Sequence, residues 1–223
     1  MLYRRVPLFW LVFWCLAALP SLAQTPTDYL SPAEGLFEAT TPLYEYNLKL
    51  RQVLYTGLSD YPLARIVGVP AFGPEYVLSL ERKTFAAQQY YLVLTQASQN
   101  IFSSASWKPE EPIPVETRQI ELRPDLALTL AEVIALATQQ ARYSPTEPGK
   151  KFDGTSFTFV SYQPGKGTRT GQTWTPLGAS SNMATLTNLV LRLQQLVTTP
   201  PEQAQQQALL AEAQQLRTRL RRP

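Results

Sequence analysis

The sequence contains no histidine and only one cysteine among its 223 residues. Without histidine the chain can form neither a Ser-His-Asp nor a Cys-His nucleophile pair, and it lacks the usual general base of neutral pH. The common nitrogen and sulfur ligands of zinc are missing as well. The kinds of catalysis that remain are carboxylate chemistry and a dyad built on Lys or Tyr. The third possibility is that the protein has no catalytic activity. These absences favour a protein that is not an enzyme and binds no cofactor or metal.

The first 23 residues have the organisation of a secretory signal peptide. Arg4 and Arg5 precede an apolar run over 8–19, and the Pro-Ser-Leu-Ala segment at 20–23 sets small residues at both positions that a signal peptidase reads. The run of about 12 residues is shorter than the roughly 20 of a spanning helix. We expect cleavage after Ala23 and a periplasmic or secreted chain with no transmembrane span.

Removal of residues 1–23 would change the composition of the chain. The lone Cys15 would leave with the apolar run, so no disulfide is expected; Val-Phe-Trp before it lacks the small residues of a lipid-modified cysteine. The net charge would fall from +3 to +1, with 18 basic and 17 acidic residues left after loss of two arginines. Four basic residues crowd at the C-terminus: Arg217, Arg219, Arg221 and Arg222. The body is nearly neutral, which excludes a nucleic-acid partner.

The order of predicted elements indicates a single α+β domain over 41–198, with an antiparallel sheet that carries helices on one face. Residues 24–40 are rich in Thr, Pro and Ser and predict an extended arm. Strands are predicted at 64–70, 76–81, 90–95, 115–122, 153–159 and 172–174, the last two joined by a Gly-rich loop. Helices are predicted from Thr41, from a capping box at 129–132, and over 186–197. The segment after Thr41 also alternates as a strand would, but its helical spacing is favoured.

Residues 199–223 predict a C-terminal amphipathic helix. Its apolar positions are spaced four, three and four apart: Leu209, Ala213, Leu216 and Leu220. The helix is expected to dock on its own domain or to pair weakly with another chain, while a third possibility places its arginines on anionic lipid. Because the seam is short, deletion of 199–223 is expected to leave a folded domain.

Four residues are the candidate ligand-binding residues: Arg65, Glu75, Asp153 and Trp174. Arg65 and Glu75 flank a Pro-rich bend on adjacent predicted strands. They can be interpreted as a functional charge pair or as a structural salt bridge. Asp153 precedes a glycine, where it can reach a ligand or cap its own turn. Trp174 lies near a strand end, as a stacking platform or as part of the core.

An ordered series of short motifs links the two halves of the domain. The first half has SDYP at 59–62, then VPAF at 69–72 and PEYVL at 74–78. The second half has DGT at 153–155, then TWTP at 173–176 and SNM at 181–183. This series resembles a group of uncharacterised exported bacterial proteins, over roughly residues 45–197. The group often has Ser where this chain has Ala71. The resemblance implies a single domain, and no known activity or cofactor.

The leading hypothesis is therefore a non-enzymatic envelope protein that binds a ligand, either an envelope protein or a small molecule. The alternative is a carboxylate-based hydrolase acting on envelope glycans. Such an enzyme needs two acidic side chains about 5–10 Å apart across a cleft. The acidic residues near predicted strand ends are Glu75, Glu81 and Asp153.

Overall fold

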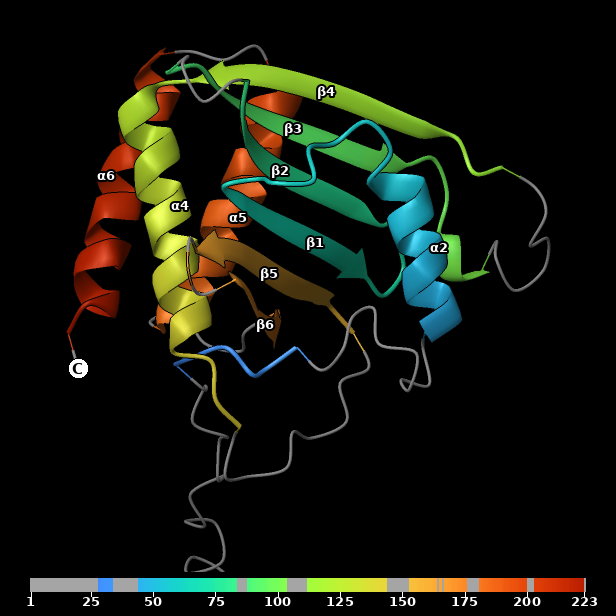
Figure 1. The fold of residues 1–223 in the computed structure, drawn as a ribbon, viewed down its shortest axis with the longest axis horizontal. Helices are drawn as coiled ribbons and strands as arrows, with labels where there is room; N and C mark the ends of the chain where they lie inside the picture. The colour runs from blue at the N-terminus through green and yellow to red at the C-terminus, as the bar shows by residue number, and fades with distance from the viewer. Residues whose placement is uncertain are drawn as a thin grey trace, which may run out of the picture.

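Six antiparallel strands form one sheet in the order β4-β3-β2-β1-β5-β6 (Figure 1). The strands are β1 (Ala64–Pro70), β2 (Tyr76–Arg82), β3 (Tyr90–Ala97), β4 (Val115–Leu122), β5 (Thr155–Gln163) and β6 (Gly167–Trp174). The first four follow one another as a meander, and the helix after β4 returns the chain so that β5 pairs with β1. The antiparallel α+β architecture predicted from the sequence is confirmed.

This computed structural model describes residues 28–33, 44–83, 88–103, 112–143, 153–163, 165, 167–175, 181–199 and 203–222. The predicted signal peptide, its cleavage site and Cys15 lie outside the described residues, as does Thr41. The described helices are α2 (Tyr44–Leu54), α4 (Pro124–Gln139), α5 (Asn182–Thr198) and α6 (Gln203–Leu220). In that part of the chain no helix is long and apolar enough to span a membrane.

The two faces of the sheet carry different helices. Side chains alternate along a strand, so Ala64 and Ile66 of β1 point to the face covered by α4, α5 and α6. Val67 points to the second face, where it pairs in register with Val77 of β2 and lies under α2. The prediction of helices on one face therefore holds for α4, α5 and α6, while α2 covers an apolar patch on the second face.

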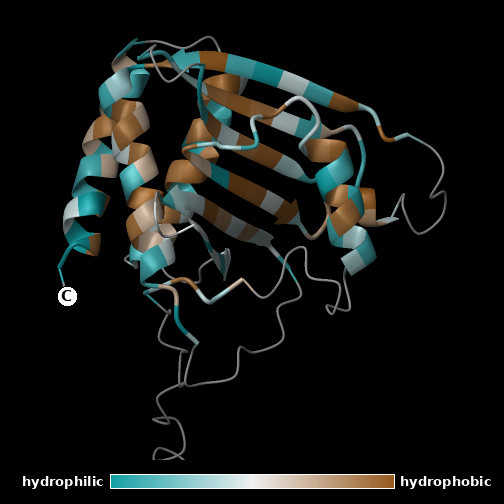
Figure 2. Ribbon diagram, viewed as in Figure 1, coloured by the Kyte–Doolittle hydropathy of each residue, from teal (hydrophilic) through white to brown (hydrophobic). Residues whose placement is uncertain are grey.

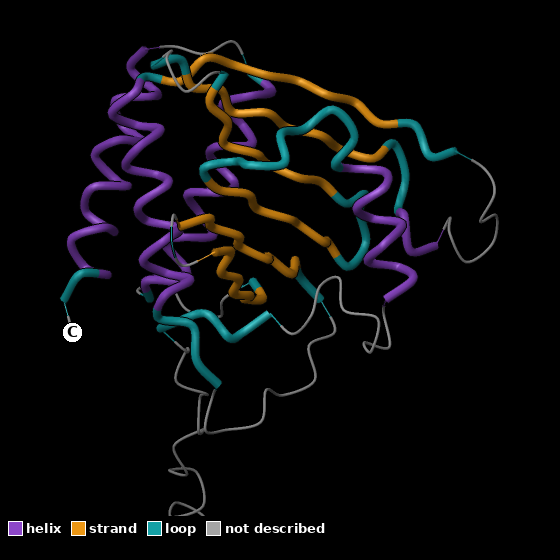
Figure 3. The backbone as a smooth tube through the Cα atoms, viewed as in Figure 1, coloured by secondary structure: helices purple, strands orange, loops and turns teal. Residues whose placement is uncertain are grey.

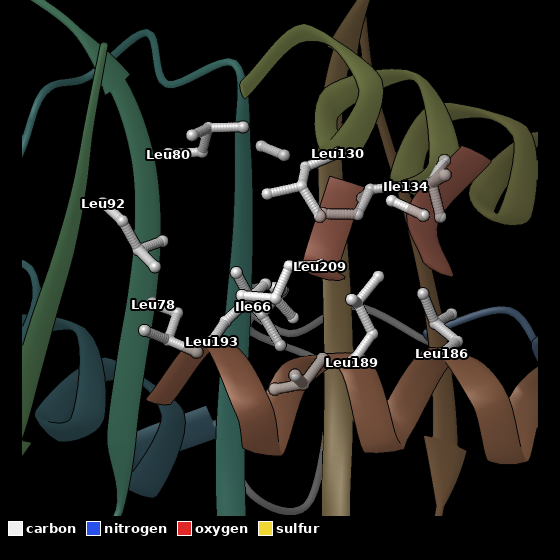
Figure 4. Close-up of a cluster of buried hydrophobic side chains, with 14 of the residues drawn as sticks. Ile66, Leu78, Leu80, Leu92, Leu130, Ile134, Leu186, Leu189, Leu193 and Leu209 are labelled. Atoms are coloured by element: carbon white, nitrogen blue, oxygen red, sulfur yellow. The ribbon is translucent and has the colours of Figure 1, made fainter. Parts of the chain in front are cut away.

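The main core lies between the sheet and the helices of the first face. Figure 4 shows leucine and isoleucine side chains of the strands directed toward those of the helices. On β5, Phe157 and Phe159 are 1% and 0% exposed, as their predicted common face requires. The hydropathy colouring shows that the central strands β1 to β3 are largely hydrophobic, as a buried sheet requires (Figure 2). Helix α6 is hydrophilic along much of its length.

Two local predictions were wrong. Helix α4 begins at Pro124, not at the predicted capping box, because a proline at the first position and Asp125 in the first turn already start it. Thr129 is buried inside the helix, and Glu132 binds arginines of α6. The β5–β6 turn is also shorter than predicted, because Gly165 and Gly167 adopt positive φ angles of 75° and 78° that permit a tight reversal.

Part of the predicted N-terminal arm extends the sheet. The backbone of Ser31 exchanges two hydrogen bonds with that of Gln172 in β6, at 2.9 and 2.7 Å. The neighbouring Leu30 is completely buried in the main core. Gly171 makes this possible, since a Cβ there would lie 2.8 Å from the Leu30 side chain. Residues 28–33 therefore belong to the packed structure.

Helix α6 docks on its own domain, beside α4 (Figure 1). Five of its apolar side chains are each at most 5% exposed: Leu209, Leu210, Ala213, Leu216 and Leu220. The Gln206 side chain accepts from the Arg123 amide (3.0 Å) and donates to the Glu121 carbonyl (3.2 Å). Arg217 and Arg221 both bind the carboxylate of Glu132. Of the alternatives for the tail, the structure shows docking within the chain.

This packing reverses the expectation that the tail can be deleted. Burial of its four leucines contributes about 6–12 kcal/mol at about 1.5–3 kcal/mol per side chain, which is comparable to the whole stability of a domain. We expect the chain without 199–223 to lose cooperative unfolding in urea, followed by circular dichroism. Leu216→Ala should lower the unfolding free energy by about 2–5 kcal/mol. The control is Gln215→Ala, at the exposed residue next to Leu216. Equal unfolding free energies of the Leu216→Ala and Gln215→Ala variants would contradict the docked helix.

The ion pairs of Glu132 predict a pH dependence. Partial burial acts to raise the pKa of this carboxyl, but Arg221 and Arg217 outweigh it and hold the pKa below the usual 4.5. A depressed carboxyl stabilises the fold above its unfolded pKa and loses that effect as the pH falls. Glu132→Gln should therefore be less stable than the natural chain at pH 7, and the difference should shrink below pH 4.5. Glu116→Gln, on a more exposed ion pair of β4, is the control.

Candidate functional site

The segment at 70–75, which comprises the last residue of β1 and the turn to β2, projects an aromatic side chain from one end of the sheet. We call these residues, Pro-Ala-Phe-Gly-Pro-Glu, the β1–β2 tip. Phe72 is 88% exposed, more than any other large hydrophobic side chain in the described ranges. Proline at 70 and at 74 restricts the backbone on both sides of it. The rest of the tip is attached to the domain through three groups of contacts.

Glu75 makes the first group of contacts, beneath the tip. It is 0% exposed, and its Oε2 accepts from the Ile101 amide at 2.7 Å. Its Oε1 accepts from the Tyr46 hydroxyl of α2 at 2.9 Å and from the Phe102 amide at 3.2 Å. Burial and the neighbouring carboxylate both raise the pKa of Tyr46, so the tyrosine remains a donor. Donors from two separate segments therefore satisfy this buried carboxylate.

Asn100 makes the second group. Its Nδ2 donates to the carbonyl of Gly73 at 3.0 Å, and its Oδ1 accepts from the Ser103 amide at 2.8 Å, as a helix N-cap does. The Ala97 amide at the end of β3 donates to the carbonyl of Glu75 at 3.0 Å. The tip is thus fixed to the segment that follows β3.

The third group comes from the β5–β6 hairpin. The Ala71 amide donates to the carbonyl of Gly154 at 2.8 Å, and Trp174 Nε1 donates to the carbonyl of Asp153 at 2.6 Å. Gly154 has φ 115°, and a Cβ there would lie 2.7 Å from Trp174 Nε1. Only glycine fits this position, because its backbone lies against the indole and in a conformation that other residues avoid.

The structure therefore brings three of the four predicted site residues, Glu75, Asp153 and Trp174, to the same end of the sheet. All three support the tip, and the contacts of Trp174 and Asp153 are with each other and with backbone. Phe72, the exposed residue at the centre, was missed. The sequence did contain an indication, since an aromatic residue stands between two prolines at a predicted bend.

Arg65 lies away from the tip, and its ion-pair partner differs from the predicted one. It pairs with Glu81 at 3.9 Å, not with Glu75. The register explains the correction. Arg65 is opposite Ser79, whose neighbour on the same face is Glu81. Glu75 is opposite a position four residues farther along β1, or about 13 Å at 3.3 Å per residue.

Glu75 and Glu81 do not form the pair that a glycoside hydrolase uses. Glu75 and Glu81 are six residues apart on one extended segment, about 20 Å at 3.3 Å per residue, whereas the two carboxylates of such enzymes lie about 5–10 Å apart. Both are also bound internally, since Glu81 accepts from the Ser59 amide (3.0 Å) and the Ser79 hydroxyl (2.9 Å). Over the residues described, no group of three His, Cys, Asp or Glu side chains is arranged to hold a metal.

Removal of the Glu75 carboxylate should loosen the tip. Glu75→Ala leaves the two amides and the Tyr46 hydroxyl without their acceptor, so we expect a loss of about 2–4 kcal/mol of unfolding free energy in urea. Hydrogen exchange at the Ile101 amide should accelerate more than at core strand amides. Glu116→Ala, on the exposed surface of β4, is the control. Unchanged exchange at Ile101 would refute the anchoring role of Glu75.

Comparison with known proteins gives no relative from which a function could be transferred: no protein-family model, curated protein or solved structure matches the chain.

Proposed function

We propose that this is an exported, non-enzymatic protein that binds a protein partner in the cell envelope, with Phe72 of the β1–β2 tip as the anchor residue. The observation that carries the proposal is the 88% exposure of Phe72 on a turn that is attached at Gly73, Glu75 and Ala71. Export rests on the signal peptide predicted at residues 1–23.

The exposure of Phe72 is unfavourable for the isolated chain. A buried phenylalanine contributes about 1.5–3 kcal/mol relative to an exposed one, and the fixed tip prevents this side chain from folding back onto its own domain. A rigid residue loses little conformational entropy when a partner covers it. Aromatic residues are enriched at the centres of protein interfaces. An exposed phenylalanine on a backbone that is held in place is therefore well suited to enter a pocket on another protein.

The surroundings of Phe72 favour a protein over a lipid surface. Phe102, which follows the anchoring amide of Ile101, is 53% exposed and contacts Tyr46 edge-to-face at 5.5 Å, adding aromatic area. Asp153 on the adjacent hairpin is exposed and acidic. Membrane-bound segments combine several apolar residues with cations that attract anionic headgroups. Two exposed phenylalanines and an acidic residue on the adjacent hairpin do not make that combination.

The proposal predicts a selective loss of binding on truncation of Phe72. A photo-crosslinking residue at position 72 should capture one defined envelope protein in the source cells, and Phe72→Ala should weaken binding of that purified partner at least tenfold, equivalent to about 1.4 kcal/mol. The unfolding free energy should change by less than about 0.5 kcal/mol because the side chain is exposed.

Position 128 provides the matched control. Leu128 of α4 is also an exposed large hydrophobic residue, at 51%, but lies on the helical side of the molecule. Crosslinking at 128 should not yield the same adduct, and Leu128→Ala should bind the partner normally. Identical adducts from both positions, or equal affinity of Phe72→Ala and the natural chain, would refute the tip as the binding site. Binding to protein-free anionic vesicles through Phe72 would refute a protein partner.

A further inference from the structure

A second aromatic surface lies at the other end of β1. The connection between α2 and β1, residues 55–63, crosses the strands on the second face (Figure 3). Within it Tyr61 is 76% exposed, and Tyr162 of β5 is 47% exposed. The two rings meet edge-to-face, with their centroids 6.3 Å apart and their planes at 71°. Together they form an open corner of aromatic surface.

The Arg65 side chain fixes the connection that carries Tyr61. Its Nη2 donates to the carbonyl of Ser59 at 2.6 Å and its Nε to the Ser79 hydroxyl at 3.3 Å. The guanidinium carbon also lies 4.4 Å from the centre of the Tyr55 ring. Arg65 is only 7% exposed, so these interactions take place away from solvent.

Ser59 is held from both of its backbone groups. Its carbonyl accepts from Arg65, and its amide donates to Glu81 Oε1 at 3.0 Å. Its hydroxyl in turn accepts from the Tyr61 amide at 3.1 Å. A buried ion pair therefore determines where Tyr61 stands, two residues farther along the chain.

This arrangement is costly for stability alone. Burial lowers the pKa of the Arg65 guanidinium, which means that the folded state disfavours its charge. Apolar residues of similar volume often stabilise such a position as well or better. The specific gain from the ion pair is the placement of the 59–61 backbone, and with it the Tyr61 ring beside Tyr162. We infer that Arg65 is a positioning residue for a surface that uses these rings.

We propose that Tyr61 and Tyr162 form a stacking platform for a neutral saccharide. The face of an aromatic ring is electronegative and attracts the polarised C–H groups of a sugar ring. Each phenol adds a hydroxyl that can donate and accept hydrogen bonds. Thr168, the exposed register partner of Tyr162, and Asp60, beside Tyr61, offer further acceptors for sugar hydroxyls. Because Arg65 is buried and paired, it presents no cation that would select an anionic ligand.

This surface is distinct from the tip, so the proposal goes beyond the binding of a protein partner. The test is an NMR titration and calorimetry of the exported chain with the tetramer of β-1,4-linked N-acetylglucosamine. We expect saturable binding that shifts signals of residues 59–62 and 160–168. Tyr61→Ala and Tyr162→Ala should each weaken binding at least fivefold, and Tyr61→Phe should weaken it less because the ring remains.

Two further variants separate the possible outcomes. Phe72→Ala should bind the saccharide as the natural chain does, whatever its effect on the protein partner. Arg65→Lys retains charge but loses the forked donor geometry, so it should weaken saccharide binding while the Tyr162 signal positions remain close to native. Absence of saturable binding would overturn the proposal. So would loss of protein-partner crosslinking in Tyr61→Ala with unchanged saccharide binding, because the platform would then be a protein interface.

Discussion

Strand β1 is the constraint on which the rest of the structure depends. It lies in the middle of the sheet and pairs with β2 on one side and β5 on the other, so it joins segments that are far apart in the sequence. Both of its faces are covered, with Ile66 under the helices and Val67 under α2. Gly68 is part of the same constraint, since a Cβ there would lie 2.3 Å from the Tyr76 ring that fills the space opposite.

Both candidate surfaces follow from the two ends of this strand. At one end the chain turns through the tip that exposes Phe72, and at the other end it arrives through the connection that exposes Tyr61. In each case a glutamate at an end of β2 hydrogen-bonds a neighbouring segment, Glu75 at the tip and Glu81 at the connection. Glu81 accepts from the Ser59 amide of the connection that it supports, whereas Glu75, itself part of the tip, accepts from the Ile101 and Phe102 amides of the segment after β3. Two of the acidic residues that suggested a hydrolase, Glu75 and Glu81, thus bind backbone amides inside the molecule.

The buried polar groups explain how the loops that carry the exposed aromatic residues are held in place. A loop held only by apolar contacts can slide, whereas a carboxylate that accepts from named amides fixes the backbone in one position. Such groups would destabilise the fold if their partners were lost. The same chemistry that makes Glu75 and Arg65 conspicuous in the sequence therefore makes them supports of the loops that carry Phe72 and Tyr61, the residues for which we propose contact with a partner or ligand.

Periodicity in the sequence determined the elements, because it depends only on neighbours along the chain. The alternation of Phe157 and Phe159 and the spacing from Leu186 to Val197 predicted β5 and α5 correctly. The motif at 129–132 wrongly predicted a helix start, because Thr129 and Glu132 both lie inside α4 and Glu132 binds arginines of α6. The predicted signal peptide is likewise a property of local sequence, and it remains a prediction.

Tertiary structure alone decided which side chains meet. Glu75 and the Ile101 amide are 26 residues apart, and Glu132 and Arg217 are 85 apart. No local pattern encodes such distances, because they depend on strand register and on how the chain returns across the sheet. Because of the strand register, Arg65 pairs with Glu81 and not with Glu75. The packing of α6 against α4 places its leucines in the core. The sequence therefore identified the chemically unusual residues, while the fold determined that they support Phe72 and Tyr61.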